Sequence, residues 1–336
     1  MDDHNLGVPG RRRWLLLFAV LLAIVLLYLS LRDILWIEVW MTIKKADWGL
    51  FLVGLGLTTF NLALRGIRWG VLLSAEMKIP PLTLFWAASV GYLGNMTLPA
   101  RAGEVIRSAA LSRKTGLGLG YIFATALTER ILDVLILVII AVLSAHSLSN
   151  LPDWMEQTMP IMAILGGVAV IVLITAPRFE NLFRKMIQIL PIHQKLKDVL
   201  ISFINRFLMG GKAFVHPVRA GGFLFFSAII WFVDGIIAIL VGKALGLTLS
   251  LAQVMLFLVG LGLSSAIPST PGYVGVYQFV AVTLLPLFGI SKSQALTYML
   301  LLQATSVVVV VIAGLIGGWQ LGIRKKTGTG IEGVDE

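Results

Sequence analysis

The sequence contains no cysteine, and only 13% of its 336 residues are charged. Without cysteine the chain has no disulfide scaffold, no thiolate metal site and no cysteine nucleophile. Soluble domains are about 25% charged, so this low charge, combined with 58% apolar residues, excludes a water-soluble fold of this size. It also excludes a disordered chain, which requires low hydrophobicity and high charge. The composition predicts an all-α integral membrane protein.

The motifs of soluble enzymes are also missing. The sequence has no HExxH, GxSxG, Walker A or dinucleotide-binding fingerprint. Its four histidines fall in tails or loops without metal-ligand spacing; they are His4, His146, His193 and His216. We therefore expect no cofactor, no metal and no catalytic residues, and a transporter is favoured over an enzyme.

The sequence does contain long apolar segments. A bilayer core about 30 Å thick is crossed by roughly 20 helical residues. We predict six full transmembrane helices, at Trp14–Leu31, Trp48–Leu73, Leu119–Ala145, Met159–Ala176, Gly221–Val241 and Ala295–Trp319. The first apolar run is too long for a signal peptide, and no small-residue cleavage site follows it.

Basic residues assign the orientation, because Lys and Arg accumulate on the cytoplasmic side of a membrane. The 177–219 connection holds eight basic and two acidic residues, whereas the 146–158 loop holds two acidic residues and no Lys or Arg. This assignment places 21 of the 27 Lys and Arg residues on one side, together with both termini. We predict a single polytopic domain over residues 1–336, located in the cytoplasmic (inner) membrane, with cytoplasmic tails at 1–13 and 320–336.

The 177–219 connection alternates basic and apolar residues. This pattern predicts amphipathic helix lying on the anionic inner leaflet. Nucleic acid is not expected as a partner, because the same basic residues set the topology.

Two further apolar segments do not fit simple crossings. Basic residues flank Pro81–Pro99 at both ends, so this segment is predicted to dip into the membrane and return. Leu251–Phe288 is interrupted at Pro268–Gly272 and is predicted to begin and end outside, either as two full helices or as a second re-entrant hairpin, which allows up to eight spans. Non-helical backbone at membrane depth requires a protein interior or a wet cavity. We therefore expect a cavity between these two segments.

A weak internal similarity links the two interruptions. Gly94–Gly103 and Gly262–Gly272 each place a Pro-x-x-x-Gly sequence after a small, polar-dotted apolar turn, once in each half of the chain. This pattern is typical of a transporter with an inverted repeat, whose site lies at the interrupted helices. Two ordinary proline-containing loops are the alternative.

Ionisable residues inside membrane spans cost free energy, so each of them is a candidate functional residue. Beside the first interruption, Glu104 and Arg107 would share one face of a helix that starts near Ala102. Together with Arg101 they would form an anion site suited to a phosphate at the helix N-terminus. The alternative is a cytoplasmic anchor in which Arg107 meets lipid headgroups, which leaves Glu104 poorly explained.

A second group, Glu129, Arg130 and Asp133, lies inside the third predicted span. Glu129 and Asp133 share a helix face, and Arg130 can reach Asp133. We expect all three to be paired inside the protein, either along a substrate path or as a structural intrahelical ion pair.

Two more polar groups lie in apolar spans. Asp234 is either neutral or paired with a basic residue of another helix, and no partner nearby in sequence supports a proton-coupling role. Asn61, Arg65 and Arg68 lie near the inner end of the second span, where we expect Arg68 to extend to the membrane surface.

These motifs resemble a known family. Leu98–Arg107 (LPARAGEVIR), Thr128–Asp133 (TERILD) and Pro271–Gly275 (PGYVG), with the Arg68-Trp69 pair, resemble the flippase-like membrane family typified by the transmembrane domain of lysylphosphatidylglycerol synthases. The resemblance covers nearly the whole chain. It implies a protein that moves or handles a lipid across the inner membrane. Members are linked to aminoacylated phosphatidylglycerol, polyprenyl-linked sugars and hopanoids.

The resemblance also implies site residues by position. They are Arg101, Gly103, Glu104, Arg107, Glu129, Arg130, Asp133, Pro271, Gly272 and Gly275. Many members continue Pro-Gly-x-x-Gly-x-x-Glu, whereas this chain has Gln278 at the last place. No soluble aminoacyl-transfer domain follows the last span, so synthase activity is not expected in this polypeptide.

The predicted function is translocation of an anionic phospholipid or a polyprenyl-phosphate-linked lipid. The headgroup would bind Arg101 and Arg107, and Glu104, Glu129 and Asp133 would gate or counterbalance these arginines. Two alternatives stay open: a membrane-embedded lipid headgroup transferase, and a non-catalytic partner that docks a separate lipid-modifying enzyme through the basic connection. Membrane lipids are the expected partners, with a separate enzyme or a homo-oligomer as open alternatives.

Overall fold

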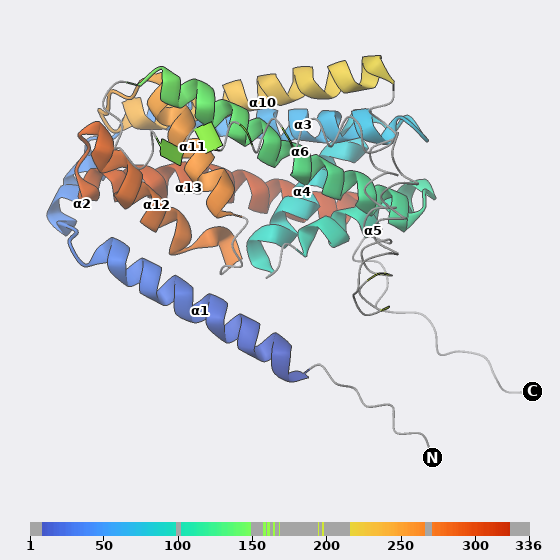
Figure 1. Cartoon of the computed structure of the whole chain (residues 1–336), viewed down its shortest axis with the longest axis horizontal. Coiled ribbons are helices and arrows are strands. Elements are labelled where there is room, and N and C mark those ends of the chain that lie inside the picture. Colours follow the sequence, from blue (N-terminus) through green and yellow to red (C-terminus); the bar gives the residue numbers. More distant parts are fainter. Residues whose placement is uncertain are drawn as a thin grey trace, which may run out of the picture.

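The computed structural model describes residues 9–98, 102–148, 216–265 and 271–322, together with scattered positions between 157 and 197. Every regular element in these stretches is helical. The α-helices labelled in Figure 1 are α1 (Pro9–Leu31), α2 (Trp36–Lys44), α3 (Trp48–Leu73), α4 (Pro81–Thr97), α5 (Gly103–Thr115), α6 (Leu119–His146), α10 (Pro217–Ala244), α11 (Leu251–Ser264), α12 (Val276–Leu284) and α13 (Lys292–Gln320). Two short 3-10 helices, η4 (Pro271–Tyr273) and η5 (Leu285–Phe288), flank α12.

Five of the six predicted spans coincide with helices, namely α1, α3, α6, α10 and α13. The sixth, Met159–Ala176, lies outside the described residues, as do most of the 177–219 connection and of the 320–336 tail. Within the described stretches, four segments are long and apolar enough to cross a membrane: α3, α10, residues 271–288 and α13. The bent pair α1 and α2 adds a fifth when it is counted as one span. The protein is therefore an all-α membrane protein, whereas a total of six to eight spans stays a prediction.

The first predicted span is followed by a helix that the apolar pattern did not indicate. The axis of α2 turns by 81° from that of α1. Its indole side chains Trp36 and Trp40 are exposed, as is typical of tryptophans at a membrane–water interface. Helix α1 packs against α12 and diverges from the bundle toward the N-terminus (Figure 1).

Helix α3 packs against α4, α10 and α13, which cover one side of its second half. Its start is capped by the Asp47 carboxylate, which accepts hydrogen bonds from the backbone N–H groups of Gly49 and Leu50 at 2.9 and 3.2 Å. Gly66 allows α4 to approach closely, because a Cβ there would lie 3.1 Å from the backbone of Leu84. This packing puts the arginines of the second half of α3 inside the bundle.

The segment Pro81–Pro99, predicted to dip into the membrane and return, forms the single helix α4, and the chain returns in the next short helix, α5, which packs antiparallel to α4. They contain 17 and 13 residues, and each is shorter than the roughly 20 residues needed to cross a bilayer. A Cβ on Gly103 would overlap the backbone carbonyl of Gly91, so the packing between them requires a glycine. Helix α5 starts at Gly103 after Ala102, as predicted.

The second interrupted segment also folds back on itself. Helix α11 contains 14 residues and α12 contains nine. They pack antiparallel, with Gly260 of α11 facing Val280 and Leu284 of α12. Of the predicted interruption Pro268–Gly272, residues 268–270 lie outside the described residues, and Pro271 and Gly272 belong to η4.

The two interruptions meet inside the bundle. Helix η4 contacts α4, and Gly272 lies beside Met96 near the end of α4. The backbone after the second interruption has positive φ angles at Gly272 (69°) and Tyr273 (59°), a region that glycine adopts readily and other residues rarely. The predicted cavity lies at this meeting point, whereas the inverted repeat stays a prediction.

Candidate functional site

Arg68 of α3 is completely buried beside the acidic residues of α6. Its guanidinium donates to both carboxylate oxygens of Asp133, at 2.5 and 3.1 Å, and to Oε1 of Glu129 at 2.6 Å. It also donates to Oγ of Ser227 at 3.2 Å and lies 4.9 Å from the ring centre of Phe223. The prediction that Arg68 extends to the membrane surface is therefore wrong, because two carboxylates of a neighbouring helix satisfy it inside the protein.

Arg107 of α5 lies on the other side of Glu129. Its Nη2 atom is 2.5 Å from Oε2 of Glu104 and 2.8 Å from Oε2 of Glu129. Its guanidinium carbon lies 4.4 Å from the ring centre of Trp69, in a cation–π contact. Glu104 and Arg107 share one face of α5, as predicted, and they form an ion pair with each other. The alternative, in which Arg107 meets lipid headgroups at the surface, is wrong because the residue is 3% exposed.

Arg130 of α6 closes this set of contacts. Its Nε, Nη2 and Nη1 atoms lie 3.5, 3.4 and 3.4 Å from Glu104, Glu129 and Asp133. The result is a closed ring of ion pairs, called the ion-pair ring below, formed by Arg68, Glu129, Arg107, Glu104, Arg130 and Asp133. The predicted intrahelical pair of Arg130 and Asp133 is one contact of this ring, and the other partners come from α3 and α5.

The ion-pair ring is formally neutral, with three arginines and three carboxylates. Charges within a membrane span are tolerated when they face the bundle interior and pair with one another. Removing one partner of a buried pair leaves an uncompensated charge and costs about 3–5 kcal/mol. The ring therefore fixes α3, α5 and α6 relative to one another.

Asp234 of α10 forms a second buried pair. Its Oδ2 atom lies 2.5 Å from Nη2 of Arg65, and its Oδ1 atom accepts a hydrogen bond from Asn61 at 2.6 Å. Arg65 also donates to the hydroxyl of Tyr92 at 3.4 Å. Of the two interpretations of Asp234, pairing with a basic residue of another helix is the one that the structure shows.

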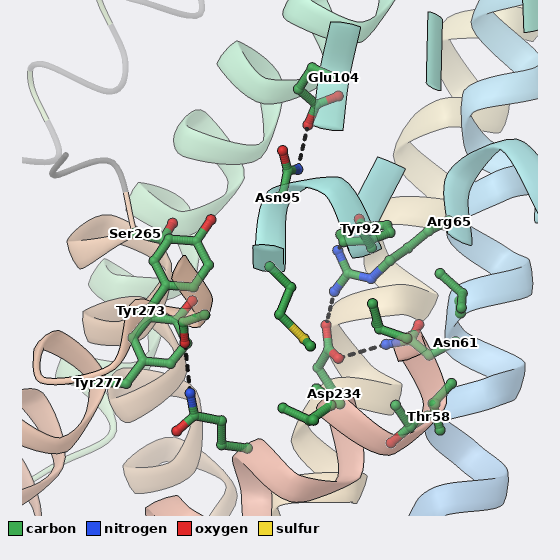
Figure 2. Close-up of a pocket in the computed structure, with 18 of the residues that line it drawn as sticks. Thr58, Asn61, Arg65, Tyr92, Asn95, Glu104, Asp234, Ser265, Tyr273 and Tyr277 are labelled. Atoms are coloured by element: carbon green, nitrogen blue, oxygen red, sulfur yellow. Dashed lines mark hydrogen bonds and ion pairs between the residues drawn. The ribbon is translucent and has the colours of Figure 1, made fainter. Parts of the chain in front are cut away.

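A cavity of about 310 Å³ lies where the two interrupted segments meet. Figure 2 shows Tyr273, Tyr277 and Ser265 on one side of it, and Arg65 and Asp234 on the other. The two tyrosine rings stack with their centres 4.8 Å apart. The remaining polar lining consists of Thr58, Asn61, Tyr92, Asn95, Glu104, Arg130, Gln303 and Ser306. The predicted cavity is therefore present and has polar walls inside an apolar bundle.

Arg130 differs from the other arginines of the ion-pair ring because it lines the cavity. Its side chain is 22% exposed, compared with 0% for Arg68 and 4% for Arg107. Its Nε and Nη2 atoms have no hydrogen-bond acceptor, and its carboxylate contacts of 3.4–3.5 Å exceed the about 2.7–2.9 Å of charge-assisted hydrogen bonds. Arg130 is therefore the arginine of the ring with the longest carboxylate contacts and the one that faces the cavity.

The sequence matches the family model for the lysylphosphatidylglycerol synthase TM region over residues 16–314. The chain belongs to this family. A UPF0104 membrane protein of Methanothermobacter thermautotrophicus is 23% identical over 78% of this chain and 82% of its own length. The UPF0104 membrane protein MJ1078 of Methanocaldococcus jannaschii is 26% identical over 66% of this chain and 91% of its own length. The predicted family is confirmed, and it makes the chain a multi-pass membrane protein.

A longer protein is also similar to this chain. Glycosyltransferase AglD of Haloferax volcanii is 23% identical over 95% of this chain. The chain spans 55% of the length of that relative. The similarity therefore concerns about half of AglD.

The Pro-Gly-x-x-Gly motif shared with the lysylphosphatidylglycerol synthase TM family acts through the backbone. Pro271 begins η4, and Gly275 has a φ of 89°. A Cβ on Gly275 would lie 2.5 Å from the carbonyl oxygen of Ala23, so this glycine allows α1 to pack against the start of α12. Arg101, also predicted from the family, lies outside the described residues.

Gln278, which stands where the family resemblance implied a glutamate, forms hydrogen bonds with both its amide oxygen and its amide nitrogen. Its Oε1 atom accepts a hydrogen bond from the Gly275 N–H at 2.7 Å, and its Nε2 donates to Oε1 of Gln303 at 2.8 Å. Gln303 in turn donates to the carbonyl oxygen of Gly272 at 2.7 Å. A backbone donor at one end and a backbone acceptor at the other fix both amide orientations. We call this chain of hydrogen bonds the glutamine relay.

The predictions from sequence missed several residues of the cavity. Gln303 lies within the predicted span Ala295–Trp319, where an uncharged amide among apolar residues was the only signal. Tyr92 and Asn95 precede the first interruption, and Tyr273 follows the second, so their closeness to an interruption could have indicated them.

Proposed function

We propose that this protein translocates a lipid with a phosphate headgroup across the cytoplasmic membrane. The lipid is an anionic phospholipid or a polyprenyl-phosphate-linked lipid, and both termini of the protein are cytoplasmic. The observation that supports this proposal is the polar cavity inside an apolar bundle, lined by Arg130, whose contacts with the ring carboxylates are 3.4–3.5 Å long. The headgroup passes through this cavity while the lipid chains stay in the bilayer.

Arg130 is the primary headgroup ligand in this proposal. The planar guanidinium offers paired N–H groups that match two oxygens of a phosphate, and its Nε and Nη2 atoms have no acceptor. Arg65 lines the same cavity and supplies a second positive charge. Arg107, to which the sequence assigned headgroup binding, does not line the cavity. Its role is instead to hold Glu104 and Glu129 in position.

Glu104 is the residue that has to respond when a phosphate binds. The charges that line the cavity are balanced, so a phosphate adds an uncompensated negative charge. Glu104 lies 3.5 Å from Arg130 but 2.5 Å from Arg107, and it accepts a hydrogen bond from Asn95 at 3.4 Å. A rotation of its carboxylate toward Arg107 would leave Arg130 to the phosphate. Glu104 therefore acts as a gate.

The contacts of the acidic residues favour transport over headgroup transfer. Each of Glu104, Glu129 and Asp133 contacts at least two arginines. A carboxylate engaged in this way is poorly placed to act as a general base, which must reach the proton that it removes. The docking alternative depends on the 177–219 connection, most of which lies outside the described residues.

Lipid exchange between the leaflets of reconstituted vesicles tests the proposal. Tail-labelled phosphatidylglycerol or polyprenyl phosphate is incorporated, and a membrane-impermeant quencher reports the fraction exposed outside. We expect protein-dependent exchange that falls about tenfold or more in Arg130→Gln, because hydrogen bonds to charged groups contribute about 1.5–3 kcal/mol. Arg113→Gln, an exposed residue at the end of α5, is the matched control. Correctly folded protein that exchanges neither lipid would refute the proposal.

A further inference from the structure

A second hollow lies beside the central cavity, between α1 and α13. It has a volume of about 480 Å³, and eight of its ten lining residues are apolar. Leu27 and Leu31 line it from α1, and Leu300 and Ala304 line it from α13. The two remaining lining residues are Gln278 and Gln303 of the glutamine relay. We call this hollow the α1–α13 groove.

The α1–α13 groove adjoins the central cavity. Gln303 and Val307 line both, so these side chains lie at the boundary between the groove and the cavity. The amide of Gln303 is held by hydrogen bonds to Gln278 and to the Gly272 carbonyl. It therefore places a polar group at the point where the apolar groove becomes the polar cavity.

The lining residues of the groove indicate which kind of molecule it can bind. None of its ten lining residues is charged, so it offers nothing to an ionic headgroup or to a charged peptide segment. Leu300 and Trp36 on its wall are exposed on the outside of an apolar bundle, where hydrocarbon is the surrounding solvent. An apolar groove that opens to the bilayer and ends at a phosphate-binding cavity matches a lipid, which has an apolar chain joined to a polar head.

We propose that the α1–α13 groove binds a hydrocarbon chain of the lipid whose headgroup occupies the central cavity. Gln303 then lies where the chain joins the headgroup, and lipid enters sideways from the bilayer between α1 and α13. This inference rests on the proposed function, and it adds the site that holds the chain. A second apolar groove, between α6 and α10, shares no lining residue with the central cavity and serves as an internal comparison.

Photolabelling of the full-length protein in vesicles tests the groove directly. One probe is phosphatidylglycerol with a diazirine in its acyl chain, and the other is diacylglycerol with the same chains and no phosphate. We expect the phosphatidylglycerol probe to label Leu300 and Ala304 more strongly than the diacylglycerol probe does, and Arg130→Gln to remove this excess. Labelling of Leu143, in the α6–α10 groove, and of Leu315, exposed on α13, should be the same for both probes.

A substitution that fills the groove tests the same site in the lipid-exchange assay. Ala304→Phe adds a ring within the groove that takes the place of the lipid chain, and we expect lipid exchange to fall by about tenfold or more. Leu315→Phe adds a ring to the same helix outside the groove and should exchange lipid as the unmodified protein does.

The two proposals fail in different ways. Equal labelling of the groove by both probes, or stronger headgroup-dependent labelling of the α6–α10 groove, would overturn the chain-binding site even if the unmodified protein exchanges lipid. Normal exchange by Ala304→Phe would overturn it as well. Absence of exchange in the unmodified protein would refute the proposed function. The comparison of the two photolabelling probes on the unmodified protein, which needs no variant, would still decide where the chain binds.

Discussion

The ion-pair ring makes a quantitative prediction about Arg68→Met. The methionine keeps most of the buried apolar stem and removes the positive charge. Arg68 donates three hydrogen bonds to Asp133 and Glu129, so the substitution leaves the ring with two arginines and three carboxylates. Removal of one partner from a buried ion pair costs about 3–5 kcal/mol, and we expect a loss of stability within this range.

The compensating variant separates charge balance from packing. Arg68→Met combined with Asp133→Leu leaves two arginines and two carboxylates, so the ring is neutral again. Replacement of a buried ion pair by apolar residues of similar volume is often neutral or stabilising. We therefore expect the double variant to recover most of the stability that Arg68→Met loses.

The free energy of unfolding is measured by titration of the detergent-solubilised protein with a denaturing detergent, followed by the fluorescence of its tryptophans. Arg113→Met, at an exposed position of α5, removes the same charge outside the ring and should change stability by less than about 0.5 kcal/mol. A cost for Arg68→Met as small as that of this control would refute the ring as a stabilising unit. Additive losses in the double variant would refute the argument from charge balance.

Two further substitutions test the interrupted segments with the same measurement. Gln278→Glu retains an acceptor for the Gly275 N–H but loses the donor to Gln303, and we expect it to lower the free energy of unfolding by about 1–3 kcal/mol. This loss should shrink at low pH, where the protonated carboxyl can donate again. A loss of stability that is independent of pH would contradict the glutamine relay. Gly103→Ala forces a Cβ against the Gly91 carbonyl and should lower stability by about 1–3 kcal/mol. Gly120→Ala, which has open space around it, should leave stability unchanged. Equal effects of the two substitutions would show that α4 and α5 pack less closely than described.

The sequence predicted helix positions well because membrane spans are local features. The limits of α3, Trp48–Leu73, follow from apolar residues that are neighbours in the chain. Basic residues on both sides of Pro81–Pro99 indicated that the chain reverses near this segment, but not that the returning helix would be α5, which itself contains Arg107 and Arg113. Helix α2 was missed because Arg32, Asp33 and Glu38 lower the local apolarity.

The partners of the polar residues could not be predicted in the same way, because they are distant in sequence. Arg68 and Asp133 are 65 positions apart, and Asn61 and Asp234 are 173 positions apart. A local pattern shows that Arg68 lies near the end of an apolar segment, which is as compatible with extension to the surface as with burial. Only the packing of α3 against α6 and α10 decides between them.

The ion-pair ring also constrains how the chain enters the membrane during synthesis. Arg68 leaves the ribosome with α3, before Arg107 and Glu104 of α5, and before the acidic residues of α6. An arginine within a membrane span is costly until it is paired, so the buried environment that stabilises Arg68 exists only once α6 has been synthesised.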